Sequence, residues 1–158
     1  MLQEISVAGR CSIVDYNGRT LYDRYIKPKL QILNLRTRWS GIKWSHLKSA
    51  VPFDEARAEI LELLDGCIVV GHALENDYNS LNINLPPPER MRDTSQYIPL
   101  RKMAKLATQQ HQLPSLKKLA KSLLGLEIQK RSHSSLVDAR VSMKLYKLVE
   151  QKWEKGKA

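Results

Sequence analysis

The sequence predicts a single α/β domain with a mixed sheet flanked by helices. Two strand-like runs flank Asn17-Gly18 and indicate a β-hairpin. The continuous apolar run 67–71 indicates a buried strand, and helical periodicity appears at 52–64, 115–124 and 135–152. A chain of 158 residues suits one domain that buries roughly two thirds of its unfolded surface.

The N-terminal strands are expected over 10–16 and 19–28, joined by a two-residue type I′ turn at Asn17-Gly18. A loop follows over 29–42. Within it, Arg36 and Arg38 lie beside Trp39, a combination that can grip phosphate and stack a base. The alternative is a packed loop whose tryptophan fills the core. A short helix is expected near 45–49.

The helix over 52–64 has clear boundary signals. Pro52 suits the first turn, Asp54 and Glu55 complement the helix dipole, and Gly66 suits the C-terminal stop. The expected apolar face consists of Phe53, Ala56, Ile60, Leu63 and Leu64.

The continuous apolar run 67–71 then predicts a central strand that is covered on both faces and is suited to parallel pairing. The carboxyl end of such a strand is where open α/β sheets place their chemistry. Asp77, just beyond it, is a candidate metal carboxylate or a helix-start acid. His72 is a candidate nucleic-acid contact or a hydrogen-bonded structural histidine. Cys11 and Cys67 are expected to be buried thiols, which argues against a disulfide framework or a zinc site.

The middle of the chain is less regular. Residues 82–89, with three consecutive prolines, are expected to form a loop, and 91–97 to contain a short strand ending at Asp93-Thr94. Residues 98–113 show no clear pattern, and His111 is expected in an exposed loop. The helix over 115–124 should end at Gly125. Its inner residues are Leu116, Leu119, Ala120 and Leu123, and its outer residues are Lys117, Lys118 and Lys121.

The last helix is expected over 135–152, with a frayed tail after Glu154. Its inner stripe is Val137, Val141, Leu145 and Leu148; its outer stripe is Arg140, Lys144 and Lys147. Residues 1–79 carry 10 basic and 10 acidic side chains, whereas residues 80–158 carry 16 and 6, so the net charge of +10 lies in the second half. This asymmetry suggests a basic surface with a polyanion partner; the alternatives are a basic solvated face or a basic tail.

His133 and Asp138 stand five residues apart, roughly 500° of helical turn, so they cannot share one helix face. If a helix starts at Ser134 or Ser135, the two groups can converge near its N-terminus as a general base beside a metal ligand. The alternative is a capping box from Ser135 to Asp138, in which Asp138 only caps the helix.

Taken together, these segments resemble the DEDDh 3′–5′ exonucleases, in the branch of the interferon-stimulated exonuclease and the apoptosis-enhancing nuclease. The resemblance covers nearly the whole chain. It rests on 10–14, 21–23, 25–28, 36–42, 69–73, 76–77, 92–94, 133–135 and 138–139.

The resemblance implies a ribonuclease H-like fold that removes nucleotides from the 3′ end of single-stranded RNA or DNA with two Mg²⁺ or Mn²⁺ ions. It implies that Asp77 and Asp138 are metal carboxylates and that His133 is the general base. Two ions roughly 4 Å apart stabilise the attacking and leaving oxygens, and both metals prefer carboxylate oxygen ligands. The same resemblance implies nuclear or nucleolar residence.

The chain departs from the family at its first motif. Residues 1–9 contain no Asp-x-Glu, and Glu4 is not a substitute because it falls in a loop. The first central strand is therefore expected to be missing or replaced, with Leu2, Ile5 and Val7 as a weak substitute. An alternative start, an incomplete gene model or a shortened paralogue would explain this.

The resemblance implies four metal-binding carboxylates, two of which the Asp-x-Glu motif supplies. Because those two are missing here, we expect little or no nuclease activity. The competing expectations are a nuclease-dead module that binds nucleic acid and an interaction domain without a substrate. The sequence does not determine whether the substrate is RNA or DNA, nor the oligomeric state. No apolar run approaches the roughly 20 residues of a membrane span, and the start of the sequence does not resemble a signal peptide.

Overall fold

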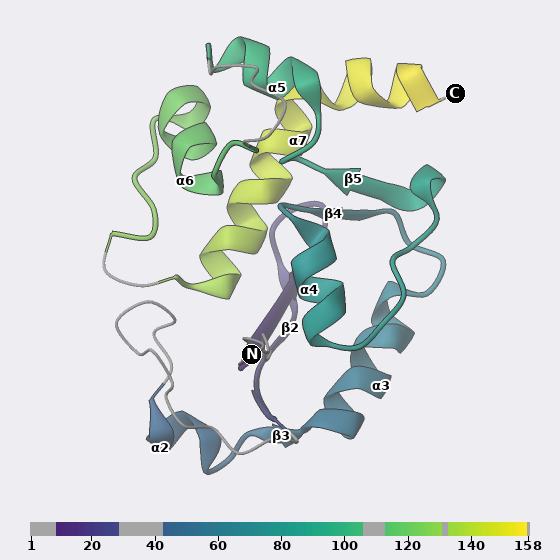
Figure 1. Cartoon of the computed structure of the whole chain (residues 1–158), viewed down its shortest axis with the longest axis vertical. Helices are drawn as coiled ribbons and strands as arrows, with labels where there is room; N and C mark the ends of the chain where they lie inside the picture. Colours follow the sequence, from purple (N-terminus) through teal and green to yellow (C-terminus); the bar gives the residue numbers. More distant parts are fainter. Residues whose placement is uncertain (1–8, 29–42, 106–112, 131–132, 158) are drawn as a thin grey trace, which may run out of the picture.

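The computed structural model describes residues 9–28, 43–105, 113–130 and 133–157 (Figure 1). The strands are β1 (Arg10–Val14), β2 (Thr20–Lys27), β3 (Val51–Pro52), β4 (Val69–Gly71) and β5 (Met91–Asp93). The helices are α2 (Trp44–Leu47), α3 (Phe53–Leu64), α4 (Leu74–Ser80), α5 (Ile98–Met103), α6 (Leu116–Leu119) and α7 (Ser135–Lys157). A 3₁₀ turn, η1 (Pro88–Arg90), precedes β5, and a π-helical turn, η2 (Ala120–Leu124), extends α6.

Strands β1 and β2 form the predicted antiparallel hairpin, but its turn is not the predicted two-residue type. The Gly18 N–H donates to the Asp15 carbonyl at 2.9 Å, and only Gly18 has a positive φ, +81°, in the turn. The Asp15 carboxylate accepts the N–H groups of Asn17 and Arg19, both at 2.9 Å. Because that side chain starts the turn one residue earlier, the loop is a three-residue turn with a bulge.

The sheet consists of two separate parts in the described chain. One has the order β1-β2-β3, with β3 parallel to β2, and the other pairs β4 with β5 in parallel. The Ile26 N–H donates to the Gly9 carbonyl. In an antiparallel pair, alternate residues direct their backbone N–H and C=O groups toward and away from the partner strand, so those of Arg10 and Ser12 point away from β2. In the ranges that the structure describes, no strand joins β1 to β4. Leu2, Ile5 and Val7 lie outside those ranges.

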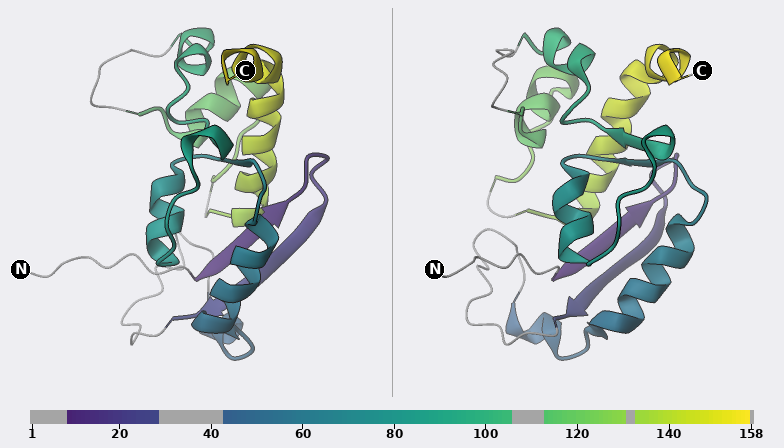
Figure 2. Two further views of the ribbon diagram at one scale, coloured as in Figure 1. Left: turned by 90° about the vertical axis from the view of Figure 1, so that its right-hand side faces the viewer. Right: turned by 45° about the vertical axis from the view of Figure 1, so that its right-hand side comes forward.

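The hairpin has helices on both faces (Figure 2). Its apolar face packs against α3, where Tyr22 and Ile26 form a buried cluster with Ala56 and Ile60. Its polar face meets the start of α7 through Ser12. The mixed sheet flanked by helices is therefore confirmed.

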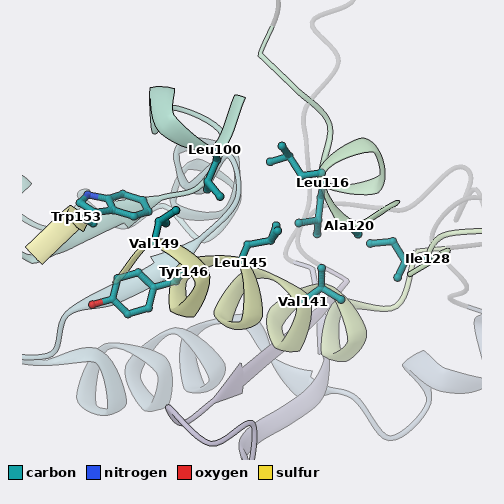
Figure 3. Packing of buried hydrophobic residues seen from close by; sticks show 10 residues of the cluster. Leu100, Leu116, Ala120, Ile128, Val141, Leu145, Tyr146, Val149 and Trp153 are labelled. Atoms are coloured by element: carbon teal, nitrogen blue, oxygen red, sulfur yellow. The ribbon is translucent and has the colours of Figure 1, made fainter. Parts of the chain in front are cut away.

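The larger core lies between α7 and the α5–α6 region (Figure 3). Ten buried side chains form it: Leu100, Leu116, Leu119, Ala120, Ile128, Val141, Leu145, Tyr146, Val149 and Trp153. The predicted helix over 115–124 is confirmed as α6 and η2, with the Ser115 hydroxyl accepting the Lys118 N–H at 3.2 Å and Gly125 at φ +65° closing it. Helix α5 (Ile98–Met103) lies in the segment 98–113, for which the sequence shows no clear pattern, and Leu100 is its buried residue.

Helix α7 differs from its prediction at both the stripe and the end. Val137 and Leu148 are 41% and 47% exposed, because the buried stripe continues from Leu145 through Val149 to Trp153. The helix also runs to Lys157, past Glu154, where the sequence predicts a frayed tail. Its last turns are anchored, since Trp153 stacks on Tyr97 with ring centroids 3.9 Å apart.

Strand β4 and the cysteines also depart from expectation. The strand begins only at Val69; Cys67 lies in the turn after α3, where its N–H donates to the Leu64 carbonyl. Cys67 is exposed and Cys11 is half-buried, so the two thiols are not buried as expected. Ile68 is 51% exposed, so the run 67–71 is not covered on both faces along its whole length. On α3, Leu63 is likewise 38% exposed instead of facing inward.

Candidate active site

The site forms where β4 ends and α4 begins. Gly71 packs closely there, because an added Cβ would collide with the Leu74 side chain and force it to move. Ala73 then adopts a left-handed conformation, φ 55°, to start the helix. The carboxylate of Asp93, at the end of β5, accepts the Ala73 N–H at 2.9 Å and the Leu74 N–H at 3.0 Å. The two parallel strands thus fix the start of α4.

His72 has both ring nitrogens occupied. Nδ1 is 2.8 Å from the Thr94 hydroxyl, and Nε2 is 2.9 Å from the Pro114 carbonyl. Burial lowers the pKa of His72, which favours the neutral ring. Through these contacts His72 connects β4 to the chain before α6. Of the two interpretations left open by the sequence, this geometry matches the hydrogen-bonded structural histidine.

Asp77 on α4 and Asp138 on α7 come from different helices, and the charge of Asp138 acts on Asp77. Burial, together with the negative charges of Asp93 and Asp138, raises the pKa of Asp77 to about 6. Burial also raises the pKa of Asp138, while Gln129, His133 and His72 act in the opposite direction. The structure therefore brings the two predicted metal carboxylates and His133 into one electrostatic neighbourhood.

His133 is exposed on the loop before α7, as the first interpretation of its spacing required. The capping-box alternative is not observed. Ser134 caps the helix, since its hydroxyl accepts the Val137 N–H at 3.5 Å and its carbonyl accepts the Asp138 N–H at 2.9 Å. The carboxylate of Asp138 instead accepts a hydrogen bond from the Gln129 amide at 3.0 Å.

Sequence reasoning missed Gln129 and the capping role of Asp93. Gln129 has a positive φ of 56° in an irregular segment, and nothing in its neighbours marks it as a partner of Asp138. Asp93 did carry a signal, because it follows a predicted strand and precedes Thr94 and Ser95. Its Oδ1 also accepts the Ser95 N–H and hydroxyl, at 2.9 Å and 2.7 Å.

The donor set fits a divalent cation only in part. Asp77 and Asp138 supply the hard oxygen ligands that Mg²⁺ and Mn²⁺ prefer. A cation between them would stabilise both buried carboxylates in their charged form and offset the repulsion that raises the pKa of Asp77. Asp93 is committed to backbone N–H groups. Over the described residues, no group of three or more His, Cys, Asp or Glu side chains is arranged to hold a metal.

The predicted nucleic-acid contacts lie in different places. On α7, Arg140 donates to the Gly18 carbonyl at 3.0 Å, and the Lys147 ammonium lies 4.0 Å from the Tyr16 ring centroid. Lys144 is exposed. Residues 29–42, which include Arg36, Arg38 and Trp39, and His111 lie outside the described residues.

Comparison with known proteins identifies the class. The family model described as exonuclease (RNase_T) matches residues 3–146. The chain therefore belongs to the exonuclease family, and its fold is the ribonuclease H-like fold that the resemblance implied.

Two curated human relatives are similar over almost the whole chain. The interferon-stimulated 20 kDa exonuclease-like 2 protein is 49% identical over 152 residues, which cover 95% of this chain and 42% of the relative. The apoptosis-enhancing nuclease is 46% identical over 156 residues, covering 98% and 47%. The chain thus spans less than half the length of these relatives.

Two solved structures share the fold. The Pan2 catalytic unit of Neurospora crassa aligns with a TM-score of 0.80 and 30% identity, covering 98% of this chain and 26% of that one. The Pan2 module of Saccharomyces cerevisiae in complex with A7 RNA aligns with a TM-score of 0.76 and 31% identity, covering 94% and 25%. In the described part of this chain, none of the helices combines the length and apolarity that a membrane crossing needs.

Proposed function

We propose that the chain is a 3′–5′ exonuclease domain that acts on the phosphodiester bonds of single-stranded RNA or DNA. The observation that carries this proposal is that the negative charge of Asp138 helps to raise the pKa of Asp77, just beyond β4, while His133 acts on Asp138 in the opposite direction. Membership of the exonuclease family supports the same chemistry. The likeness to a Pan2 module in complex with RNA favours RNA as one substrate.

In this proposal Asp77 and Asp138 would hold Mg²⁺ or Mn²⁺. When bound, a pair of such ions stabilises the attacking and leaving oxygens of phosphodiester hydrolysis. His133, exposed on the loop before α7, would accept the proton of the attacking water. Gln129 would orient the Asp138 carboxylate through its 3.0 Å hydrogen bond.

We propose in addition that these 158 residues hydrolyse nucleic acid weakly or not at all. Two-metal hydrolysis needs more carboxylate oxygens than Asp77 and Asp138 provide, and Asp93 is occupied by the start of α4. The second candidate function is a nucleic-acid-binding module without nuclease activity. The shortage of carboxylates at the site and the net charge of +10 both favour it.

Two measurements on the chain test these functions. Calorimetric titration with Mn²⁺ should give weak binding that Asp77→Asn and Asp138→Asn each reduce at least tenfold, while Asp65→Asn, an exposed acid after α3, changes nothing. A 5′-labelled single strand should bind more tightly with a free 3′-hydroxyl than with a 3′-phosphate, because the site should recognise the end of the strand.

Trimming of the same strand distinguishes the enzyme from the binding module. Slow stepwise loss from the 3′ end that His133→Ala abolishes would identify a weak exonuclease. Binding without trimming would identify the module. Rapid trimming that survives Asp138→Asn would contradict the proposed site. Nuclear residence remains a proposal from the family resemblance, to be tested by fluorescence microscopy of the tagged protein in cells.

A further inference from the structure

We infer that residues 114–130 form a second phosphate-binding surface, which carries the single-stranded nucleic acid beside the candidate site. This inference rests on the proposed function and extends it. The segment comprises the approach to α6, the helix with its extension η2, and the following turn. In Figure 1 it lies beside the half of α7 that begins at the site.

The segment is attached to the candidate site near both of its ends. At one end, the Pro114 carbonyl is 2.9 Å from Nε2 of His72, at the exit of β4. At the other end, the Gln129 amide donates to Asp138 at 3.0 Å. A ligand held along this segment would therefore lie in a fixed position relative to Asp138.

The inner side of the segment is anchored in the larger core. Leu116, Leu119, Ala120 and Ile128 are all buried there against α7 (Figure 3). A rigid element places its outward side chains more precisely than a loop does. The outer side is consequently a preformed surface.

That outer side is basic. Lys117, Lys118 and Lys121 project from the helix into solvent, and Lys130 follows the turn. Lys117, Lys121, Glu127 and Lys130 line a hollow of about 280 Å³. Lys117 and Lys121 are four residues apart, which places them on the same helix face.

The hollow contains three ammonium groups and only one carboxylate among its four lining residues. Lys130 lies 2.9 Å from Glu127, and it lowers the pKa of Glu127 most, with smaller effects from Lys121 and Lys117. The Lys130–Glu127 pair is exposed and contributes little to stability, so Lys130 can exchange the carboxylate for a phosphate. The surplus positive charge suits a chain of phosphodiesters.

The stripe on α7 is a weaker candidate for this role. Arg140 and Lys147 already contact the hairpin, through the Gly18 carbonyl and the Tyr16 ring. Lysines without an aromatic partner bind phosphates as point charges and do not read bases. Binding at 114–130 should therefore be independent of sequence and sensitive to salt.

The test uses the full chain and a fluorescent single-stranded 12-mer, with anisotropy measured across a range of salt concentrations. The double variant Lys117→Gln/Lys121→Gln should bind several-fold more weakly. The slope of log K against log salt concentration should also become shallower by about 1.4, since each phosphate contact on a single strand contributes about 0.7. Glu127→Gln should bind more tightly. The matched control is Lys152→Gln/Lys155→Gln, two exposed lysines near the end of α7.

The outcomes separate the two proposals. If the wild-type chain binds the strand but the Lys117/Lys121 variant behaves like the control, the second surface is disproved and the proposed function stands. If the correctly folded wild-type chain binds no single strand even at low salt, both proposals fall. Weaker binding by the double variant together with tighter binding by Glu127→Gln supports the inference, because a general loss of folding would not give opposite effects.

Discussion

The hydroxyl oxygens of Ser12 and Ser135 lie 2.6 Å apart, although 123 residues separate them in sequence. Ser12 donates to the Asp23 carboxylate at 2.8 Å, so Ser135 is the donor in the bond between the two serines. Asp23 in turn accepts two hydrogen bonds from Arg10, at 2.9 Å and 3.0 Å. This chain of polar contacts fixes the first turn of α7, the helix that carries Asp138, against the hairpin.

The serine pair predicts a measurable coupling. Ser12→Ala and Ser135→Ala should each lower the free energy of unfolding by about 1 kcal/mol, because each removes a partly buried hydrogen bond. The double variant should be less destabilised than the sum, since both changes remove the same bond. Urea unfolding of the four proteins measures this. Strict additivity would show that the bond does not stabilise the fold.

Helix α7 offers a matched pair of leucines three residues apart. Leu145→Ala should lower stability by about 2 to 5 kcal/mol, because Leu145 is fully buried and its truncation leaves a cavity. Leu148→Ala should change stability by no more than about 0.5 kcal/mol, since Leu148 is 47% exposed. Denaturant unfolding distinguishes them. Equal losses would mean that the buried stripe includes Leu148 after all.

Glu154 predicts a dependence of stability on acid. Its hydrogen bonds with Arg92, at 2.7 Å and 2.9 Å, lower the pKa of Glu154 from 4.5 to about 2. A carboxylate whose pKa is lower in the folded state contributes fully above pH 4.5, and its contribution is lost as the pH falls from 4.5 toward 2.

Glu154→Gln should therefore lower stability at pH 7 by about 2 kcal/mol, because the almost fully buried Arg92 loses its carboxylate. The variant should also lose less stability on acidification than the wild type. Thermal unfolding at a series of pH values measures both effects. Parallel curves for the two proteins would rule out this ion pair as the source of the acid sensitivity.

Asp77 predicts how cation binding depends on pH. Only the ionised carboxylate binds Mn²⁺, and the pKa of Asp77 is raised to about 6. The affinity should consequently increase between pH 5 and 7, by about tenfold per unit well below the pKa. Calorimetry of the wild type and Asp77→Asn checks this. A residual affinity of the variant that keeps the same pH profile would assign the titration to another group.

The sequence already contained the elements that depend on local chemistry. Turn residues, boundary signals and periodicity located the hairpin, α3, the helix over 115–124 and the start of α7, because these features act within a few residues. Asp77, His133 and Asp138 were candidates from the strand exit and the helix-start spacing, and the resemblance implied the role of each. Local signals failed where a side chain redirected the backbone, as Asp15 does in the hairpin turn.

Burial and partnership depended on contacts between distant segments. Leu145 and Leu148 are the same residue type on one helix, and only the position of α6 and the following turn decides that Leu145 is buried. Gln129 meets Asp138 because the segment after α6 returns to the start of α7. The residue types and motifs were thus determined by the sequence itself, whereas exposure, hydrogen-bond partners and shifted pKa values were decided by tertiary packing, since each depends on groups remote in the chain.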